Sequence, residues 1–262
     1  MEFSFYRVRA VILRSFMAER RNFMRLMDAM YWPIMDILLW GMSSSWIAKS
    51  HSKLPDIVLV IMTGLVFWQV VMRASYEISV GLIEEVWSKS FVTLFSTPLT
   101  VREWILGVML NGIIKTLFVL FFGVLIVWLL YALNIFTFGW MLIPFVISLI
   151  LFGWVTGFVG ASLIVYWGNK VSSVPWVFAF LFAPFSAVYY PIDALPVWGQ
   201  YLAYCLPLSY IFEGMRTVIF SNTYPWEQLA ISFGLNSIYL FISLSFFKFM
   251  FKKSRKRGFD RL

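Results

Sequence analysis

The sequence has few of the side chains on which enzymes and disulfide-bonded domains depend. Its 262 residues include one cysteine, Cys205, and one histidine, His51. A single cysteine excludes an intrachain disulfide and a metal site built from cysteines. The sequence contains no G-x-x-x-x-G-K-[ST] phosphate loop and no His/Glu metal cluster. We therefore expect that the chain does not hydrolyse ATP, is not an enzyme, and binds no cofactor or metal of its own.

Charged residues are also scarce. They make up 13% of the chain and hydrophobic residues make up 61%, whereas soluble domains are about a quarter charged and about half apolar. The apolar residues form long runs, which is typical of a helical integral membrane protein. The net charge of +8 comes mostly from basic residues near the two ends of the chain. We therefore expect contact with membrane lipid and none with nucleic acid.

The apolar runs predict an all-α integral membrane fold with six transmembrane helices. Each helix needs about 20 apolar residues to cross a hydrocarbon core about 30 Å thick. The predicted spans are 30–48, 57–72, 104–133, 140–167, 174–190 and 226–247. Basic residues precede the first span and fill the tail 248–262. This charge pattern predicts that both termini are cytoplasmic, in a plasma (cytoplasmic or inner) membrane.

Residues 1–28 predict an amphipathic helix on the cytoplasmic surface of the membrane. At about 100° per residue, Arg7, Arg14, Arg21 and Arg25 fall in a stripe about 40° wide. Apolar side chains take most of the other side, where two further arginines weaken the pattern. Such a helix lies along the membrane interface.

Asp36 and Lys115 lie well inside predicted spans, Arg73 lies at the inner end of the second span, and Asp28 lies at the cytoplasmic edge of the first. A charge within the bilayer is costly, so each is a candidate functional residue. Asp36 would suit the proton site of a secondary transporter. The alternative is a structural role, in which Asp36 pairs with Lys115 or Arg73 or forms a hydrogen bond between subunits.

The segment between the second and third spans is more charged than its neighbours. The acidic residues that share one helical face are Glu77, Glu84 and Glu85. Helical order should stop before Pro98, and a new helix should follow Thr100, with Glu103 at capping-box spacing. A helix of this kind across the inner face can dock into a partner protein, or it can simply pack on its own bundle.

Residues 191–222 are apolar and aromatic but broken by prolines. Pro191 should end the fifth span, because proline lacks a backbone donor and clashes with the preceding turn. Pro196 should open a short helix. Pro207 should break it and precede a second short helix over 208–220.

These features predict a re-entrant pair of half-helices between the fifth and sixth spans, dipping into the outer leaflet. The alternative is an outer cap that only stabilises the bundle. Glu213 and Arg216 have the i, i+3 spacing of a helical ion pair. The candidate residues for an outer gate or for cargo contact are Tyr189, Tyr190, Trp198, Tyr201, Tyr204, Glu213 and Arg216.

Three motifs, in this order, carry a family resemblance: FSTPLTVREWILG, YYPIDALP and LPLSYIFEGMR. With the amphipathic N-terminal helix, they make the chain resemble the membrane (permease) subunit of ABC-2 type ABC transporters. That group includes polysaccharide, lipo-oligosaccharide and drug exporters. The resemblance covers nearly the full length of the chain.

The resemblance implies a half-transporter that pairs with a second copy of itself or with a related permease. A separate ATPase subunit would bind ATP and Mg. Residues 1–28 would form the connecting helix of the family, and residues 77–98 its coupling helix. The residues that would couple to the ATPase are Glu77, Glu84, Glu85, Trp87, Phe91, Phe95 and Pro98. The cargo would be amphipathic, such as a lipid-linked glycan, a lipid or a drug, and would move outward.

Two other classes of function stay open at this point. A proton- or ion-coupled secondary transporter would work without an ATPase and would give Asp36 a direct role. A channel or a scaffold is compatible with the composition but gives no reason for the charged segment before Pro98.

Overall fold

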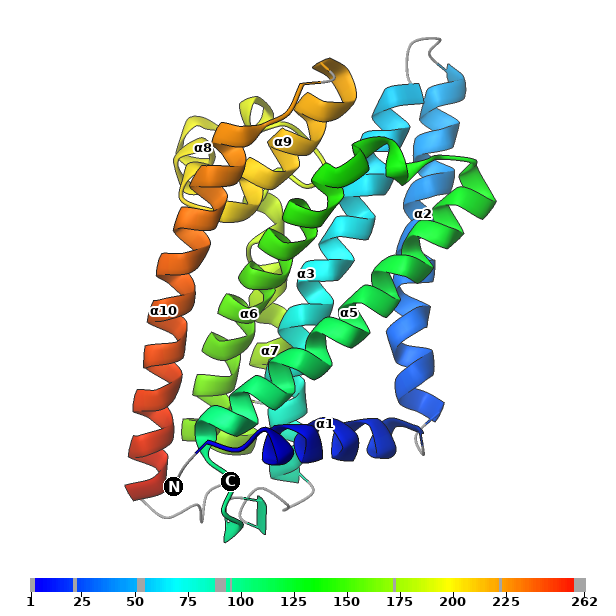
Figure 1. Cartoon of the computed structure of the whole chain (residues 1–262). Helices are drawn as coiled ribbons and strands as arrows, with labels where there is room; N and C mark the ends of the chain where they lie inside the picture. Colours follow the sequence, from blue (N-terminus) through cyan, green and yellow to red (C-terminus); the bar gives the residue numbers. More distant parts are fainter. Residues whose placement is uncertain are drawn as a thin grey trace.

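The computed structural model describes residues 3–20, 23–50, 55–87, 93–94, 96–171, 173–221 and 223–256, which form a helical bundle with no strand among them (Figure 1). The long helices are α2 (Phe23–Ser50), α3 (Pro55–Trp87), α5 (Val101–Tyr131), α6 (Leu142–Trp167) and α10 (Trp226–Lys256). The shorter ones are α1 (Phe5–Arg20), α7 (Val174–Phe180), α8 (Val197–Tyr204) and α9 (Pro207–Ser221). Short 3₁₀ segments are η1 (Ile135–Met141), η2 (Gly168–Val171), η3 (Ala183–Phe185) and η4 (Ile192–Ala194).

Within the described residues, four helical stretches are long and apolar enough to cross a membrane. They are Val58–Ile83, Val101–Tyr131, Ile135–Trp167 and Trp226–Lys256. They correspond to the second, third, fourth and sixth predicted spans, so the chain is a multi-pass helical membrane protein. The first and fifth predicted spans fall in α2 and in the segment after η2, which do not belong to this set.

Helix α3 is longer than the sequence predicted. The apolar run suggested an end near residue 72 and a separate helix from residue 77, but the structure has one continuous helix to Trp87. No proline interrupts this range, and two polar contacts form along the helix. The Ser79 hydroxyl donates to the Ser75 carbonyl at 2.8 Å, and Arg73 pairs with Glu77. Polar residues therefore marked the end of the apolar run without ending the helix.

The prediction of one helix over 174–190 is wrong beyond Phe180. Helix α7 ends there, and a 3₁₀ turn and irregular backbone follow. Pro184 lies within the predicted helix and cannot supply the backbone donor that the helix needs. Ala187 has a φ of 57°, in the left-handed region. In Figure 1 the chain nevertheless passes from the lower end of α6 to α8 at the upper end of the bundle.

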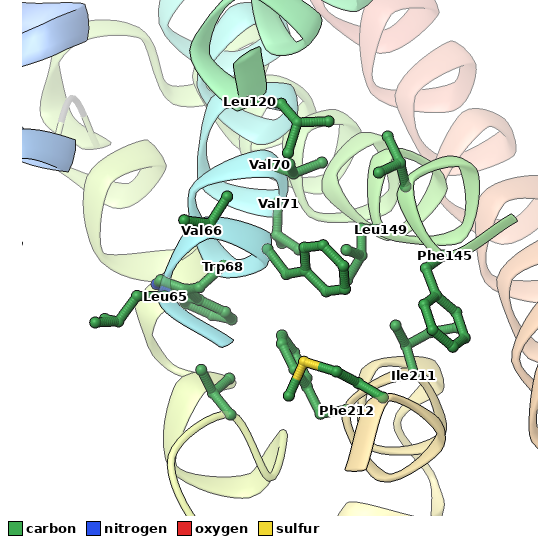
Figure 2. Close-up of a cluster of buried hydrophobic side chains, with 14 of the residues drawn as sticks. Leu65, Val66, Trp68, Val70, Val71, Leu120, Phe145, Leu149, Ile211 and Phe212 are labelled. Atoms are coloured by element: carbon green, nitrogen blue, oxygen red, sulfur yellow. The ribbon is translucent and has the colours of Figure 1, made fainter. Parts of the chain in front are cut away.

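The hydrophobic core surrounds α3, which is the most buried of the four apolar stretches. In their most apolar windows 72% of the α3 residues are buried, against 28% for α5 and 22% for α10. Figure 2 shows Val70 and Val71 of α3 among Leu149 of α6 and Phe212 of α9. These contacts fix α3 as the central helix, with α5 and α10 at the periphery.

Close approach of α3 and α6 depends on two glycines of α6. A Cβ atom on Gly153 would lie 2.8 Å from the Val71 carbonyl oxygen, and one on Gly157 would lie 2.9 Å from the Ser75 carbonyl oxygen. Both distances are too short for a real side chain. The small-residue contact therefore sets the spacing of the two helices.

Helix α1 lies across the lower end of the bundle, roughly perpendicular to the long helices (Figure 1). It packs on α5, where Val11 contacts Gly107. The helix ends at Arg20 and α2 begins at Phe23, so the predicted segment 1–28 contains the start of α2 as well. The end of α10 lies at the same end of the bundle as α1.

Candidate functional site

An ion cluster inside the bundle joins α3 to α5. The Glu77 carboxylate, with 7% of its side chain exposed, receives Arg73 Nη2 at 2.6 Å on Oε1. Lys115 Nζ of α5 pairs with Oε2 of the same carboxylate. Arg73 also lies over the Tyr76 ring, 5.4 Å from its centroid. Glu77 was predicted to face a partner protein, but here its carboxylate is buried between two cations of its own chain.

Asp36 is a second acidic group inside the bundle, and its partner differs from both predicted cations. Gln69 Nε2 of α3 donates to Asp36 Oδ2 at 2.7 Å. Arg73 and Lys115 both pair with Glu77 instead. Asp36 is half-buried, and among the described residues no cation lies within ion-pair distance of it.

An aromatic pair stands next to Asp36. Trp40, one helical turn further along α2, stacks on Tyr189 with ring centroids 5.2 Å apart and an interplanar angle of 14°. Trp40 is 45% exposed, so the pair presents an open aromatic surface beside the carboxylate.

The neighbouring face of α2 is packed. Its buried stripe is Pro33, Ile37, Gly41 and Ser44. Gly41 has no room for a side chain, because a Cβ atom there would collide with the Tyr131 ring of α5. The Tyr131 hydroxyl donates to the Ile37 carbonyl at 3.2 Å. This contact holds α2 against α5 and so fixes the rotation of α2 about its axis, which determines where Asp36 points.

A polar junction ties α1 to the start of α5. Thr100 and Glu103 form the predicted capping box, with the Thr100 amide donating to Glu103 Oε2 at 2.8 Å. Glu103 Oε1 accepts the Ser4 amide at 2.7 Å and pairs with Arg7 Nη2 at 3.1 Å. Arg7 also donates to the Pro98 carbonyl. One buried glutamate thus connects α1, the segment before α5, and α5 itself.

Arg216 organises the outer segment at the upper end of the bundle. Its guanidinium pairs with Glu213 at 3.2 Å, as the i, i+3 spacing predicted. It also donates to the carbonyls of Ala187 and Tyr190, the latter at 3.0 Å. Glu213 in turn accepts the Ile192 amide at 2.8 Å.

The structure separates the predicted cargo candidates into two places. Tyr189 faces α2 through Trp40, and the Tyr190 hydroxyl donates to the Pro184 carbonyl at 2.6 Å. The remaining aromatic candidates lie on α8 and are exposed: Trp198, Tyr201 and Tyr204. The two short helices, α8 after Pro196 and α9 from Pro207, occur where the prolines predicted them.

The residues predicted to couple to an ATPase are only partly described. Pro98 is exposed. Phe91 and Phe95 lie outside the described residues. Three more of these residues lie in the last turn of α3, but their side chains are outside the described part of the structure: Glu84, Glu85 and Trp87.

One buried polar cluster was not predicted. Asn236 of α10 donates through Nδ2 to the Ser148 hydroxyl of α6 at 2.8 Å, and that hydroxyl lies 2.7 Å from the Ser232 hydroxyl. Ser232 also donates to the Pro207 carbonyl at 2.9 Å. A single asparagine at mid-span was the available signal, because a buried amide needs partners.

Comparison with known proteins identifies a family. The family model described as ABC-2 type transporter matches residues 7–220 of this chain. The match takes in most of α1, the ion cluster, Asp36 and nearly all of α9. A comparison with curated proteins gave no match. No group of three His, Cys, Asp or Glu residues that could hold a metal ion occurs among the described side chains.

Proposed function

This chain belongs to the ABC-2 type transporter family, and from that premise we propose that it is the permease subunit of an ATP-driven exporter. It forms the translocation pathway together with a second copy of itself or a related permease. A separate ATPase subunit binds ATP and Mg and drives the transport. The cargo is amphipathic, such as a lipid-linked glycan, a lipid or a drug, and it moves outward.

The observation that carries this proposal is the junction at Glu103. It connects α1 and Pro98 to the N-terminus of α5 through hydrogen bonds and one ion pair. A displacement of α1 or of the segment before Pro98 is therefore transmitted directly to α5, a long helix of the bundle. An ATPase that docks at this end can shift the equilibrium between two conformations of the permease. It does so if ATP binds the two conformations of the ATPase with different affinity.

The proposed topology has six crossings. Helix α2 makes the first, and the broken segment 174–190 makes the fifth. Both termini are then cytoplasmic, which fits the position of α1 and the end of α10 at the same end of the bundle. The opposite end carries α8 and α9, which form a re-entrant outer element in a plasma or inner membrane. Backbone of this irregular kind is tolerated at membrane depth where protein satisfies its hydrogen bonds, as Arg216 does for the Ala187 and Tyr190 carbonyls.

Affinity purification of the tagged chain from its native membrane tests the partnership. Native mass spectrometry of the purified complex should find two permease chains and two ATPase subunits that carry a phosphate loop. Recovery of the chain alone, with no ATPase in any mild detergent, would contradict the proposal.

A charge reversal tests where the ATPase docks. The double variant Glu84→Lys, Glu85→Lys should lower ATPase recovery and ATP-driven transport while the permease stays folded, because these residues follow the buried part of α3. Glu227→Lys is the matched control, since Glu227 is an exposed acid in the first turn of α10 at the other end of the bundle. Equal ATPase recovery with both variants would remove the docking assignment.

One observation favours a second candidate function. Asp36 is a half-buried carboxylate without a cationic partner among the described residues, as in a proton- or ion-coupled secondary transporter. Such a carrier transports when a proton gradient is imposed and ignores ATP. Transport by the purified chain without an ATPase, driven by that gradient, would favour this candidate over the exporter.

A further inference from the structure

Four side chains from three parts of the chain meet on one side of α2. Asp36 and Trp40 come from α2, Gln69 from α3, and Tyr189 from the irregular segment after η3. Gln69 holds Asp36 Oδ2 at 2.7 Å, and Trp40 stacks on Tyr189. The group thus combines a carboxylate, an amide and two parallel aromatic rings.

The Asp36 carboxylate needs a positive charge that the described part of its own chain does not supply. The two basic residues predicted as its partners, Arg73 and Lys115, pair with Glu77. Gln69 donates one hydrogen bond but carries no charge. A carboxylate accepts about four hydrogen bonds, so acceptor sites of Asp36 stay open.

The position of the group suits a transported ligand. Asp36 lies at the middle of the 28-residue helix α2, and Gln69 lies near the middle of the apolar stretch Val58–Ile83. Substrate sites of membrane transporters tend to lie near this depth. Trp40 is 45% exposed, so a ligand can reach the group from the open side of α2.

The chemistry of the group selects among ligands. A metal ion would need several oxygen ligands, and the described residues offer no cluster of three acidic or otherwise ligating side chains. A neutral polyol would use the amide and the ring faces but would leave the carboxylate without a counter-charge. An organic cation satisfies both features, because it pairs with the carboxylate and is attracted to the faces of Trp and Tyr rings.

We infer that Asp36, Trp40, Gln69 and Tyr189 form the binding site for the positively charged group of an amphipathic organic cation, which is the cargo. The inference rests on the proposed permease function and adds a substrate class to it. Asp36 provides the negative charge, and Gln69 orients its carboxylate. The stacked rings of Trp40 and Tyr189 contact the cation and the apolar groups around its charge.

Equilibrium binding of tetraphenylphosphonium tests the site. The complex of the chain with its ATPase is placed in lipid nanodiscs without nucleotide, and tetraphenylborate serves as the anionic probe of the same shape. Asp36→Asn should weaken phosphonium binding by at least about tenfold, since it removes one partner of a partly desolvated charge pair. Asp36→Glu should keep most of the affinity.

The aromatic part of the site has its own variant and control. Trp40→Leu should weaken binding by about 2- to 30-fold, the range that cation–π contacts cover. Trp46→Leu removes another exposed tryptophan of α2 and should leave binding unchanged. Thermal unfolding of each variant, compared with the unmodified chain, identifies any loss of affinity that comes from misfolding.

The results separate this inference from the proposed function. Equal affinity of the unmodified chain and Asp36→Asn, or equal binding of borate and phosphonium, would overturn the cation site and leave the exporter proposal standing. Phosphonium binding that depends on Asp36, in a complex whose transport ignores ATP, would sink the exporter proposal and keep the site. Nanodiscs of two lipids distinguish a lipid amine from a free cation as the cargo. If the cargo is a lipid amine, phosphatidylethanolamine should compete with the phosphonium for the site, and phosphatidylglycerol should not.

Discussion

Replacing Glu77 with glutamine should destabilise the bundle, because the two oxygens of its carboxylate serve two different cations. Oε1 receives Arg73 at 2.6 Å and Oε2 receives Lys115. Glutamine keeps one acceptor oxygen but turns an NH₂ group toward the second cation. The side chain of Glu77 is 7% exposed and those of Arg73 and Lys115 are 16% exposed, so water compensates little of the loss.

The expected cost follows from these contacts. Removing one partner of a buried ion pair costs about 3–5 kcal/mol in soluble proteins. Polar groups in an unfolded chain that stays in the membrane find other partners, which reduces such costs. We therefore expect Glu77→Gln to lower the free energy of unfolding by about 2–3 kcal/mol.

Unfolding of the purified chain in mixed micelles with increasing SDS measures this free energy. Lys115→Met serves as the matched second variant, because it removes a cation and leaves the Arg73–Glu77 pair intact. Adding Lys115→Met to Glu77→Gln should recover part of the lost stability, since one uncompensated cation is gone, and the two effects should not add. If Glu77→Gln unfolds at the same SDS fraction as the unmodified chain, the carboxylate does not hold α3 to α5 and this reasoning is refuted.

Three further variants test other contacts. Gly153→Leu should lower the free energy of unfolding by about 2–3 kcal/mol through overpacking, because the backbone of α3 lies where the new side chain would start. The control is Gly234→Leu, which should change this free energy little, because a Cβ atom there would have no other atom within 4 Å. Equal effects of the two variants would count against the close α3–α6 contact. Arg216→Met should speed hydrogen exchange at the Ile192 amide and around it, since it unties the carbonyls of Ala187 and Tyr190; unchanged exchange there would show that the outer segment holds its shape without the guanidinium. Glu103→Gln should raise hydrogen exchange in α1 by removing the charge that pairs with Arg7, and an α1 as protected as before would contradict the junction.

Local sequence signals predicted the features that depend on neighbouring residues. The capping box of Thr100 and Glu103 spans three residues and is present. Helices α8 and α9 begin where Pro196 and Pro207 indicated. Each of these features depends on backbone conformation within about one helical turn, so a single sequence contains the information.

Contacts between distant residues were not predicted, even when one partner was known. Glu103 was recognised as a capping residue, but its ion pair with Arg7 joins positions far apart in the chain. For Asp36, the structural alternative to a proton site was a pair with Arg73 or Lys115 or a hydrogen bond between subunits. Those cations pair with Glu77 because α3 continues past its apolar run and brings Glu77 one turn from Arg73.

The fifth predicted span shows a related limit. Hydropathy detected an apolar segment over 174–190 but could not show its broken backbone. Pro184 was the local signal for the break, and the length of the apolar run outweighed it in the prediction. The irregular segment is held by Arg216, whose hydrogen bonds to Ala187 and Tyr190 bridge more than twenty positions.

The central claim, that ATP bound to a separate subunit changes the conformation of a permease dimer, can be measured at Cys205. This residue is the one cysteine of the chain and is exposed at the end of α8, so a nitroxide label attaches there without mutation. Pulsed electron–electron resonance on the labelled permease, assembled with an ATPase stripped of accessible cysteines, reports the distance between two copies. We expect a dipolar signal whose distance distribution shifts on addition of ATP and vanadate. A distribution that ignores ATP and moves with a proton gradient would contradict an ATP-driven permease, and the absence of a dipolar signal would contradict the pairing of two copies of this chain.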